Sequence, residues 1–202
     1  MTHGHTHFAT LSVLVLMLAG CGSSPKEHFY TLSAGAAPES AASAQTAAAY
    51  SVAIGPVPVP DGVDRPQLVV RTGANQVAIL EQQRWAEPLK SEIPRVLAEN
   101  LAQILGTRQV SAYPQSASGD SEYRVQVDIQ RFESALGGPV TIDAIWTVRR
   151  GTGEPRKGQS LTRESAGGGG YEALVGAYSR ALATMSRDIA VAIRSYSSAP
   201  QN

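Results

Sequence analysis

The stretch YRVQVDIQ, residues 123–130, decides the fold, because its apolar and polar residues alternate without a break. Successive side chains of a β-strand point to opposite faces, so this alternation predicts a strand with one buried face. A second alternating run follows the turn at 137–139, and a third strand is expected near 159–164. Together they predict a meander. The apolar positions of the second run are Val140, Ile142, Ala144, Trp146 and Val148.

More strands are predicted upstream of this meander. Residues 50–54 form a strand that enters the proline-rich segment 55–60, which cannot donate to both sides of a sheet, so we expect an edge strand or a strand exit. Residues 67–71 and 77–80 flank a turn at 73–75 and predict a hairpin. A short strand is expected at 110–113. Four apolar residues near the proline-rich edge could instead contact another copy of the chain: Val57, Val59, Leu68 and Val69.

Two amphipathic helices are predicted. Apolar residues spaced by three and four run from Leu89 to Leu105, and Gly106 ends this helix. Pro94 removes a hydrogen bond if the helix starts at Pro88 but not if it lies in the first turn, and both starts remain open. Residues 167–170 are interpreted as a glycine connector, not a phosphate loop, because no Lys-Ser or Lys-Thr follows. The last helix buries Leu174, Tyr178, Ala181, Leu182, Met185, Ile189 and Ile193.

The order of these elements is strands, helix, strands, helix. It predicts one α+β domain over residues 50–195, with a single mixed, mainly antiparallel sheet and both helices packed on one of its faces. Residues 196–202 are expected to be a disordered tail.

The N-terminus predicts export and lipidation. Residues 8–17 are apolar or small, and LAGC at 18–21 supplies the only cysteine of the chain, Cys21. LAGC resembles the bacterial lipobox, which implies that residues 1–20 are cleaved and that Cys21 is lipidated. The alternative is an ordinary signal peptide followed by a free thiol, which the uncharged N-terminal region, rich in histidine, keeps open.

Residues 21–49 are expected to be the lipidated cysteine and a flexible tether, because Ser, Ala, Gly, Pro and Gln dominate them. Such a chain has a reach of roughly 30 Å. One apolar cluster, Phe29–Leu32, interrupts it. This cluster either docks on the domain or a partner, or is a sticky patch beside the anchor.

Composition excludes several classes of function. Lys plus Arg equals Asp plus Glu at 17 each, which gives no basic surplus for binding nucleic acid. His28 is the only histidine after the predicted cleavage site, so a Ser-His-Asp system and a His/Cys metal site lack their parts. We therefore expect no metal and no cofactor, while composition alone leaves catalysis by carboxylates open.

Charged and aromatic residues gather at two junctions between predicted elements. We expect them to form one partner or oligomer surface. An acid–base pair of Asp64 and Glu87 is the less favoured alternative, against turn capping by Asp64, helix capping by Glu87 or Ser91, and an ion pair of Arg65. Trp85 and Trp146 are interpreted as core residues. The surface consists of Asp64, Arg65, Pro66, Arg84, Trp85, Glu87 and Pro88, with Ala86 and Leu89 in the same segment.

Several stretches in order resemble the ABC-type transport auxiliary lipoproteins, the family of paraquat-inducible protein C. The resemblance covers nearly the whole chain, and DRPQLV and RWAEPL are its most specific segments. The stretches are LAGC at 18–21, FYTL at 29–32, IGPVPVPDGVDRPQLVVR at 54–71, RWAEPLKSEIPRVLAENLAQIL at 84–105, YRVQVDIQRFE at 123–133 and DAIWTV at 143–148.

This resemblance implies an outer-membrane lipoprotein on the periplasmic face, anchored through Cys21. It implies a non-catalytic docking subunit of a mammalian-cell-entry (MCE) type ABC system that moves lipids between two membranes. The implied partners are an MCE-domain periplasmic protein and further copies of this chain. The alternative function is a lipoprotein that regulates or assists a cell-wall enzyme.

Overall fold

The computed structural model describes residues 25–35, 51–115 and 120–197. The predicted signal peptide, Cys21 and most of the predicted tether and tail lie outside these ranges. The described elements are β1 (His28–Tyr30), β2 (Val52–Ile54), β3 (Gln67–Gly73), β4 (Gln76–Trp85), α2 (Leu89–Leu105), β5 (Val110–Ala112), β6 (Tyr123–Ser134), β7 (Pro139–Arg150), β8 (Arg156–Ser165) and α3 (Tyr171–Ser197).

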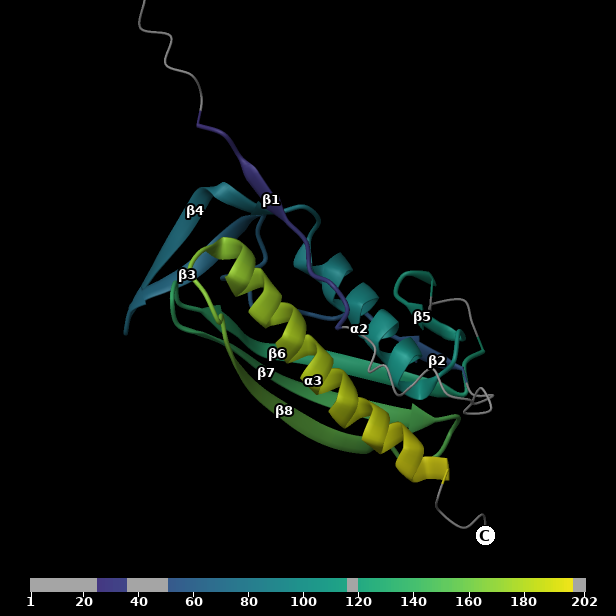
Figure 1. The fold of residues 1–202 in the computed structure, drawn as a ribbon. Helices are drawn as coiled ribbons and strands as arrows, with labels where there is room; N and C mark the ends of the chain where they lie inside the picture. Colours follow the sequence, from purple (N-terminus) through teal and green to yellow (C-terminus); the bar gives the residue numbers. More distant parts are fainter. Residues whose placement is uncertain (1–24, 36–50, 116–119, 198–202) are drawn as a thin grey trace, which may run out of the picture.

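The predicted meander is confirmed as the centre of a five-stranded sheet, β5-β2-β6-β7-β8 (Figure 1). Strands β6, β7 and β8 pair antiparallel, while β2 runs parallel to both β5 and β6. Alternate residues of β6 and β7 are buried, and the residues between them are more exposed. The period of two therefore assigned the core face correctly.

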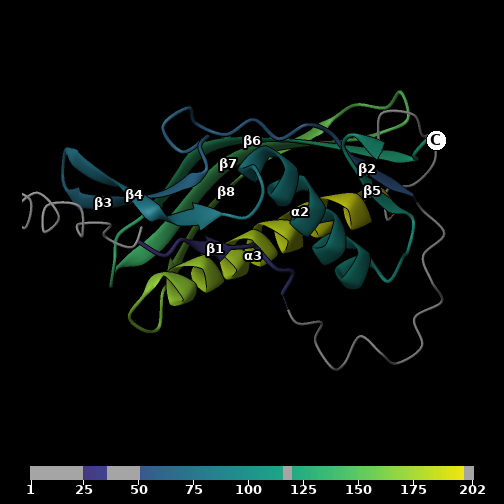
Figure 2. The same cartoon turned by 90° about the horizontal axis from the view of Figure 1, so that it is seen from above.

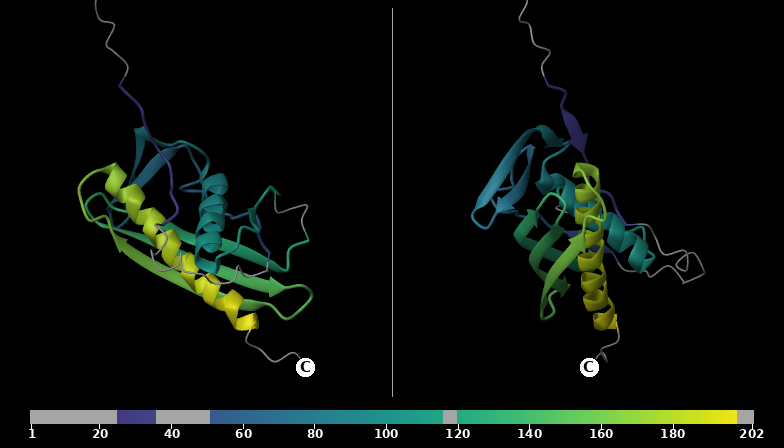
Figure 3. Two further views of the ribbon diagram at one scale, coloured as in Figure 1. Left: turned by 45° about the vertical axis from the view of Figure 1, so that its right-hand side comes forward. Right: turned by 60° about the vertical axis from the view of Figure 1, so that its left-hand side comes forward.

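Both predicted helices are confirmed, and they cover the same face of the five-stranded sheet (Figure 2). Helix α3 lies across β7 and β8, and α2 packs beside it over β2 and β5, as the two views in Figure 3 show. Gly106 ends α2 in the left-handed conformation, with φ at 68°. All seven apolar residues predicted for one face of α3 are buried.

The expectation of a single sheet is wrong. Strands β1, β4 and β3 form a separate three-stranded sheet, in that order. The prolines at 56, 58 and 60 lack N–H groups, so the chain leaves β2 after three residues and starts a new hairpin. Among the described residues, one isolated bridge, Arg71 to Ala135, joins this hairpin to the end of β6.

The strand β2 is not an edge strand, because it lies between β5 and β6. The proline-rich segment after it is a strand exit, which was the other expectation. Val57, Val59 and Leu68 are buried in the core, so a contact between copies built on these three is wrong, whereas Val69, the fourth residue of that prediction, is half-buried.

Helix α2 starts directly after Pro88, which leaves Pro94 inside it. Pro88 is the N-cap and makes no side-chain hydrogen bond, so the predicted capping by Glu87 or Ser91 is wrong. The carbonyl of Pro88 accepts hydrogen bonds from the N–H groups of Ser91 and Glu92.

The predicted tail starts too early. Tyr196 lies in α3, its hydroxyl is 2.9 Å from the Val148 carbonyl oxygen, and it accepts a hydrogen bond from the Arg156 N–H at 2.9 Å. These contacts tie the last turn of the helix to the ends of β7 and β8, a link that helical periodicity does not reveal.

Candidate partner-binding site

The hairpin of β3 and β4 brings together the two junctions that the sequence singled out. Residues 64–66 precede β3 and residues 84–88 end β4 and lead into α2. In an antiparallel hairpin the start of one strand lies beside the end of the other. Gln67 accordingly pairs with Arg84, and the Trp85 N–H donates to the Pro66 carbonyl at 2.7 Å.

A cavity of about 440 Å³ lies where these segments meet. It collects all seven residues of the predicted partner surface, together with Ala86 and one residue that the prediction left out. That residue is Phe29, whose side chain is 60% exposed. We call this cavity the Phe29 site; its lining is Phe29, Asp64, Arg65, Pro66, Arg84, Trp85, Ala86, Glu87 and Pro88.

Phe29 reaches the site through β1. This strand pairs parallel with β4, and Phe29 is the register partner of Arg84. Sequence patterns missed the pairing, because a three-residue strand has no measurable period and its partner lies more than fifty residues away. The available signal was FYTL itself, an apolar cluster in a polar segment.

Trp85 forms the inner wall of the site rather than an exposed surface. It is 6% exposed, with ring centroids 6.2 Å from Phe132 and 6.0 Å from Tyr178, both in edge-to-face geometry. Burial also raises the pKa of the Tyr178 hydroxyl. The core interpretation of Trp85 is confirmed, as is that of Trp146, which is 8% exposed.

Ion pairs surround the mouth of the Phe29 site. Lys90 Nζ lies 2.5 Å from Asp64, which raises the pKa of Lys90, and Arg84 lies 2.7 Å from Glu27. Arg65 Nε is buried and has no hydrogen-bond partner within the described ranges. An apolar, aromatic wall with a charged rim is the composition of a protein contact surface. The Asp64 carboxylate forms an ion pair with Lys90.

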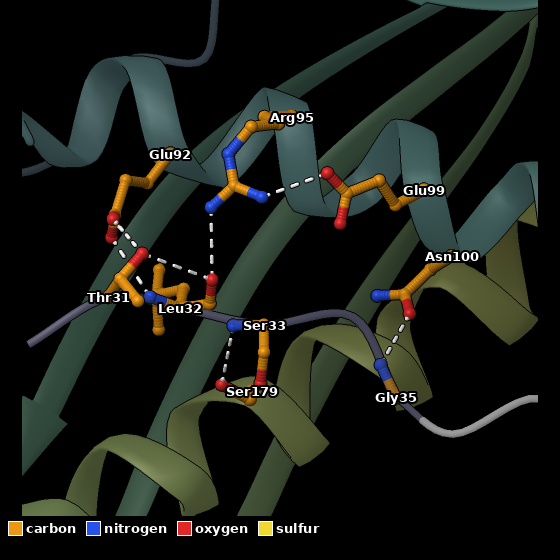
Figure 4. A network of polar contacts seen from close by, with 9 residues as sticks. All are labelled: Thr31, Leu32, Ser33, Gly35, Glu92, Arg95, Glu99, Asn100 and Ser179. Atoms are coloured by element: carbon orange, nitrogen blue, oxygen red, sulfur yellow. Dashed lines mark hydrogen bonds and ion pairs between the residues drawn. The ribbon is translucent and has the colours of Figure 1, made fainter.

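A second feature lies next to the site: the segment 28–35, which we call the strap. It runs between α2 and α3 and is held by side chains of both helices (Figure 4). Glu92 is fully buried and accepts hydrogen bonds from Thr31 Oγ1 at 2.5 Å and from the Leu32 N–H at 3.1 Å. Arg95 donates to the Leu32 carbonyl at 3.0 Å.

The far end of the strap is held in the same way. The Ser33 N–H donates to Ser179 Oγ at 3.2 Å, and the Gly35 N–H donates to Asn100 Oδ1 at 2.9 Å. A Cβ on Gly35 would lie 3.0 Å from that of Ala183, so a glycine permits this close approach.

The expectation of a tether is therefore wrong for the strap. Leu32 is 1% exposed, and the apolar cluster docks on the domain, which was one of the two alternatives for it. The polar composition around FYTL suggested a flexible chain, but the side chains that hold it by hydrogen bonds lie on two helices that are distant in the sequence.

Glu92 is the buried group that sequence reasoning missed. Burial raises the pKa of its carboxyl, although the hydrogen bonds from Thr31 and Leu32 and the charge of Arg95 act in the opposite direction. One signal was available: Glu92 lies three residues after Leu89 and four before Val96, on the apolar stripe of α2.

Two further observations concern the described part of the chain. No helix there is both long enough and apolar enough to cross a membrane. Within the same ranges, no three or more His, Cys, Asp and Glu side chains gather as metal ligands would.

Solved structures share this fold. A crystal structure of an uncharacterized protein is 22% identical, with a TM-score of 0.68, over 84% of this chain and 99% of its own. A Xanthomonas campestris protein is 15% identical, with a TM-score of 0.59, over 81% of this chain and 92% of its own. No curated protein matches the chain.

The family of ABC-type transport auxiliary lipoprotein components matches residues 30–190. This range starts inside β1 and ends within α3, so it spans both sheets, both helices and nearly all of the strap. The chain therefore belongs to the family of ABC-type transport auxiliary lipoprotein components.

Proposed function

We propose that this protein is a docking subunit anchored by lipid on the periplasmic face of the outer membrane. Cys21 carries the anchor, and the domain serves an MCE-type ABC system that moves lipids between the two membranes. The role is non-catalytic and the protein acts as a homo-oligomer. Membership of an auxiliary lipoprotein family and the LAGC sequence support this proposal.

One observation carries the proposal. The two most family-specific segments, DRPQLV at 64–69 and RWAEPL at 84–89, are separated in sequence, yet residues 64–66 and 84–88 of them line a single cavity together with an exposed phenylalanine. Aromatic residues and arginine are enriched in the centres of protein interfaces. The Phe29 site is therefore the surface that we assign to the partner.

The test is a pull-down of the mature, tagged protein from detergent-solubilised envelopes, with Cys21→Ser as the unanchored control. The interface variant combines Arg65→Glu with Glu87→Lys, which reverses two charges at the site. Trp85→Ala is unsuitable, because Trp85 is buried and its loss would unfold the domain. Arg187→Glu on the exposed side of α3 is the matched control.

We expect an MCE-domain protein to be recovered with the wild type and with Arg187→Glu, and to be lost with the interface variant. Recovery of cell-wall synthases without any MCE protein would replace this proposal with the alternative function. Retention of the MCE protein by a folded interface variant would show that the Phe29 site is not the contact.

A further inference from the structure

We infer that the strap turns the predicted tether into a short stalk, so that the face bearing Phe29 lies against the membrane that holds the anchor. The inference rests on the proposed lipidation of Cys21. It adds to the proposed function a distance from the membrane and an orientation of the domain. The membrane lies next to this face, and the Phe29 site itself remains the surface assigned to the partner.

The strap is attached along its whole length. Its first three residues pair with β4, the next ones are held by Glu92 and Arg95 of α2, and its end is held by Asn100 of α2 and Ser179 of α3. Glu27, just before the strap, adds the ion pair to Arg84. Extending the stalk would require pulling buried Leu32 out of the core.

Chain length then limits the height of the domain above the membrane. Pro25, the first described residue, is four positions from Cys21 and Phe29 is eight, which correspond to at most about 14 Å and 28 Å of extended chain. A free tether over residues 22–49 would permit about 95 Å at full extension. Docking of the strap removes most of that freedom.

The strap also sets which end of the domain faces the anchor. The Tyr30 ring lies 6.4 Å from that of Tyr171, at the start of α3, and Gly35 lies against Ala183 further along the helix. The chain therefore enters at the Tyr171 end. Helix α3 has 27 residues, so its other end is about 40 Å away.

The entry face has the chemistry of a membrane-surface contact. Phe29 is 60% exposed there, and Lys26, three residues earlier, is exposed as well. An exposed aromatic side chain suits the headgroup region of a bilayer, and the charge of Lys26 is offset there by Glu172, while Glu27 pairs with Arg84. A partner that occupies the Phe29 site must accordingly bring its own segment to within about 28 Å of the bilayer surface.

Resonance energy transfer from a dye on α3 to an acceptor lipid in the membrane tests this orientation. Glu172→Cys and Val191→Cys place single labels at exposed positions 19 residues apart, about 28 Å along the helix axis. Cys21 is the only native cysteine, so its acylation leaves the introduced thiol as the only one that reacts with a dye. The lipidated protein is reconstituted in phosphatidylethanolamine and phosphatidylglycerol vesicles that contain an acceptor lipid.

We expect transfer to be several-fold more efficient from position 172 than from position 191. A matched control inserts about 20 Gly and Ser residues after Gly22, which adds a reach of roughly 25 Å without touching the strap. This insertion should abolish most of the difference between the two labels while far-UV circular dichroism stays unchanged.

Equal transfer from both positions, or a difference that survives the insertion, would overturn the inference. Failure of the anchor has a separate signature. If Cys21 is not acylated, two dyes bind per chain and the protein does not float with the vesicles, which overturns both the inference and the anchor in the proposed function. Loss of the MCE partner in the pull-down leaves the orientation intact.

Discussion

The meander with α3 and the strap with α2 are held together by different interactions: alternate residues of β6 and β7 are buried, whereas in the strap Leu32 alone is buried. Against α3 the sheet presents mainly apolar side chains, and polar contacts, such as those of Tyr196 and the hydrogen bond from Ser160 to Asp188, add to this packing. Against α2 the strap presents backbone N–H and C=O groups, which pair with the buried side chains of Glu92 and Asn100 and with the half-buried Arg95. Packing tolerates changes of similar volume, whereas a buried polar group needs its particular partner.

The two regions also differ in how far apart in sequence their partners lie. Neighbouring strands of the meander are joined by short turns, so local alternation sets their register. Thr31 is 61 residues from Glu92, and Ser33 is 146 residues from Ser179. The four predictions below test this contrast.

The largest effect is expected for Leu32→Ala in the strap. If the strap is part of the core, this substitution lowers the free energy of unfolding by about 2–5 kcal/mol, as much as Leu182→Ala in α3. Phe29→Ala, on an exposed neighbour, should change it by about 0.5 kcal/mol or less. Urea denaturation of the mature chain measures the free energies of unfolding of the three variants. If Leu32→Ala left this free energy unchanged, residues 28–35 would have to be described as a flexible tether after all.

A close approach in the meander supplies the next test. A Cβ on Gly158 would lie 2.2 Å from Cζ2 of Trp146, so Gly158→Ala should destabilise the domain by about 1–3 kcal/mol. A Cβ on Gly176 in α3 would make only an ordinary van der Waals contact, with Arg180 Nη1 at 3.5 Å, so Gly176→Ala should stabilise the domain by up to about 1 kcal/mol. Thermal unfolding of both variants decides the prediction; similar melting temperatures would contradict it.

The buried carboxyl of Glu92 makes the strap region sensitive to pH. Its pKa in the folded protein is raised above the ordinary value of 4.5 by burial, so the folded state binds the proton more tightly than the unfolded state. The stabilisation is fully present below pH 4.5 and is lost as pH rises through the raised pKa. Urea midpoints of the wild type should therefore fall relative to those of Glu92→Gln as pH rises; parallel profiles would count against this.

The smallest effect is expected at the surface, for Glu27→Gln. This substitution removes the ion pair between Glu27 and Arg84. The side chain of Arg84 is 30% exposed and that of Glu27 is 46% exposed. Such pairs contribute about 0.2–1 kcal/mol and weaken with salt. Urea denaturation at low and at high salt measures this contribution. If Glu27→Gln lowered the free energy of unfolding as much as Leu32→Ala, the surface ion pair would stabilise the strap as much as the burial of Leu32 does.

Much of the fold follows from periodicity. Strands β6 and β7 and helices α2 and α3 were predicted with their buried faces, because each is long enough for its period to be visible. The division into two sheets was missed, since it depends on where the chain goes after the prolines at 56–60. Tyr196 was missed because its partners lie on β7 and at the start of β8, far from it in the sequence.

The candidate site was predicted in part. Residues 64–66 and 84–88 were expected to share one surface, and the antiparallel hairpin places them there because the start of β3 lies beside the end of β4. Phe29 could not be added from sequence, because β1 is only three residues long. Trp85 was expected both at this surface and in the core. It packs against Phe132 and Tyr178 in the core and also forms the inner wall of the Phe29 site.

The sequence by itself determined the α+β class, the faces of the long elements and the resemblance to the family, since all three depend on patterns within continuous stretches. Only the tertiary structure decided that residues 28–35 belong to the domain. Their hydrogen-bond partners, Glu92, Asn100 and Ser179, are single polar residues on two helices, and no local pattern connects them to the strap. Such contacts exist only once both helices are packed.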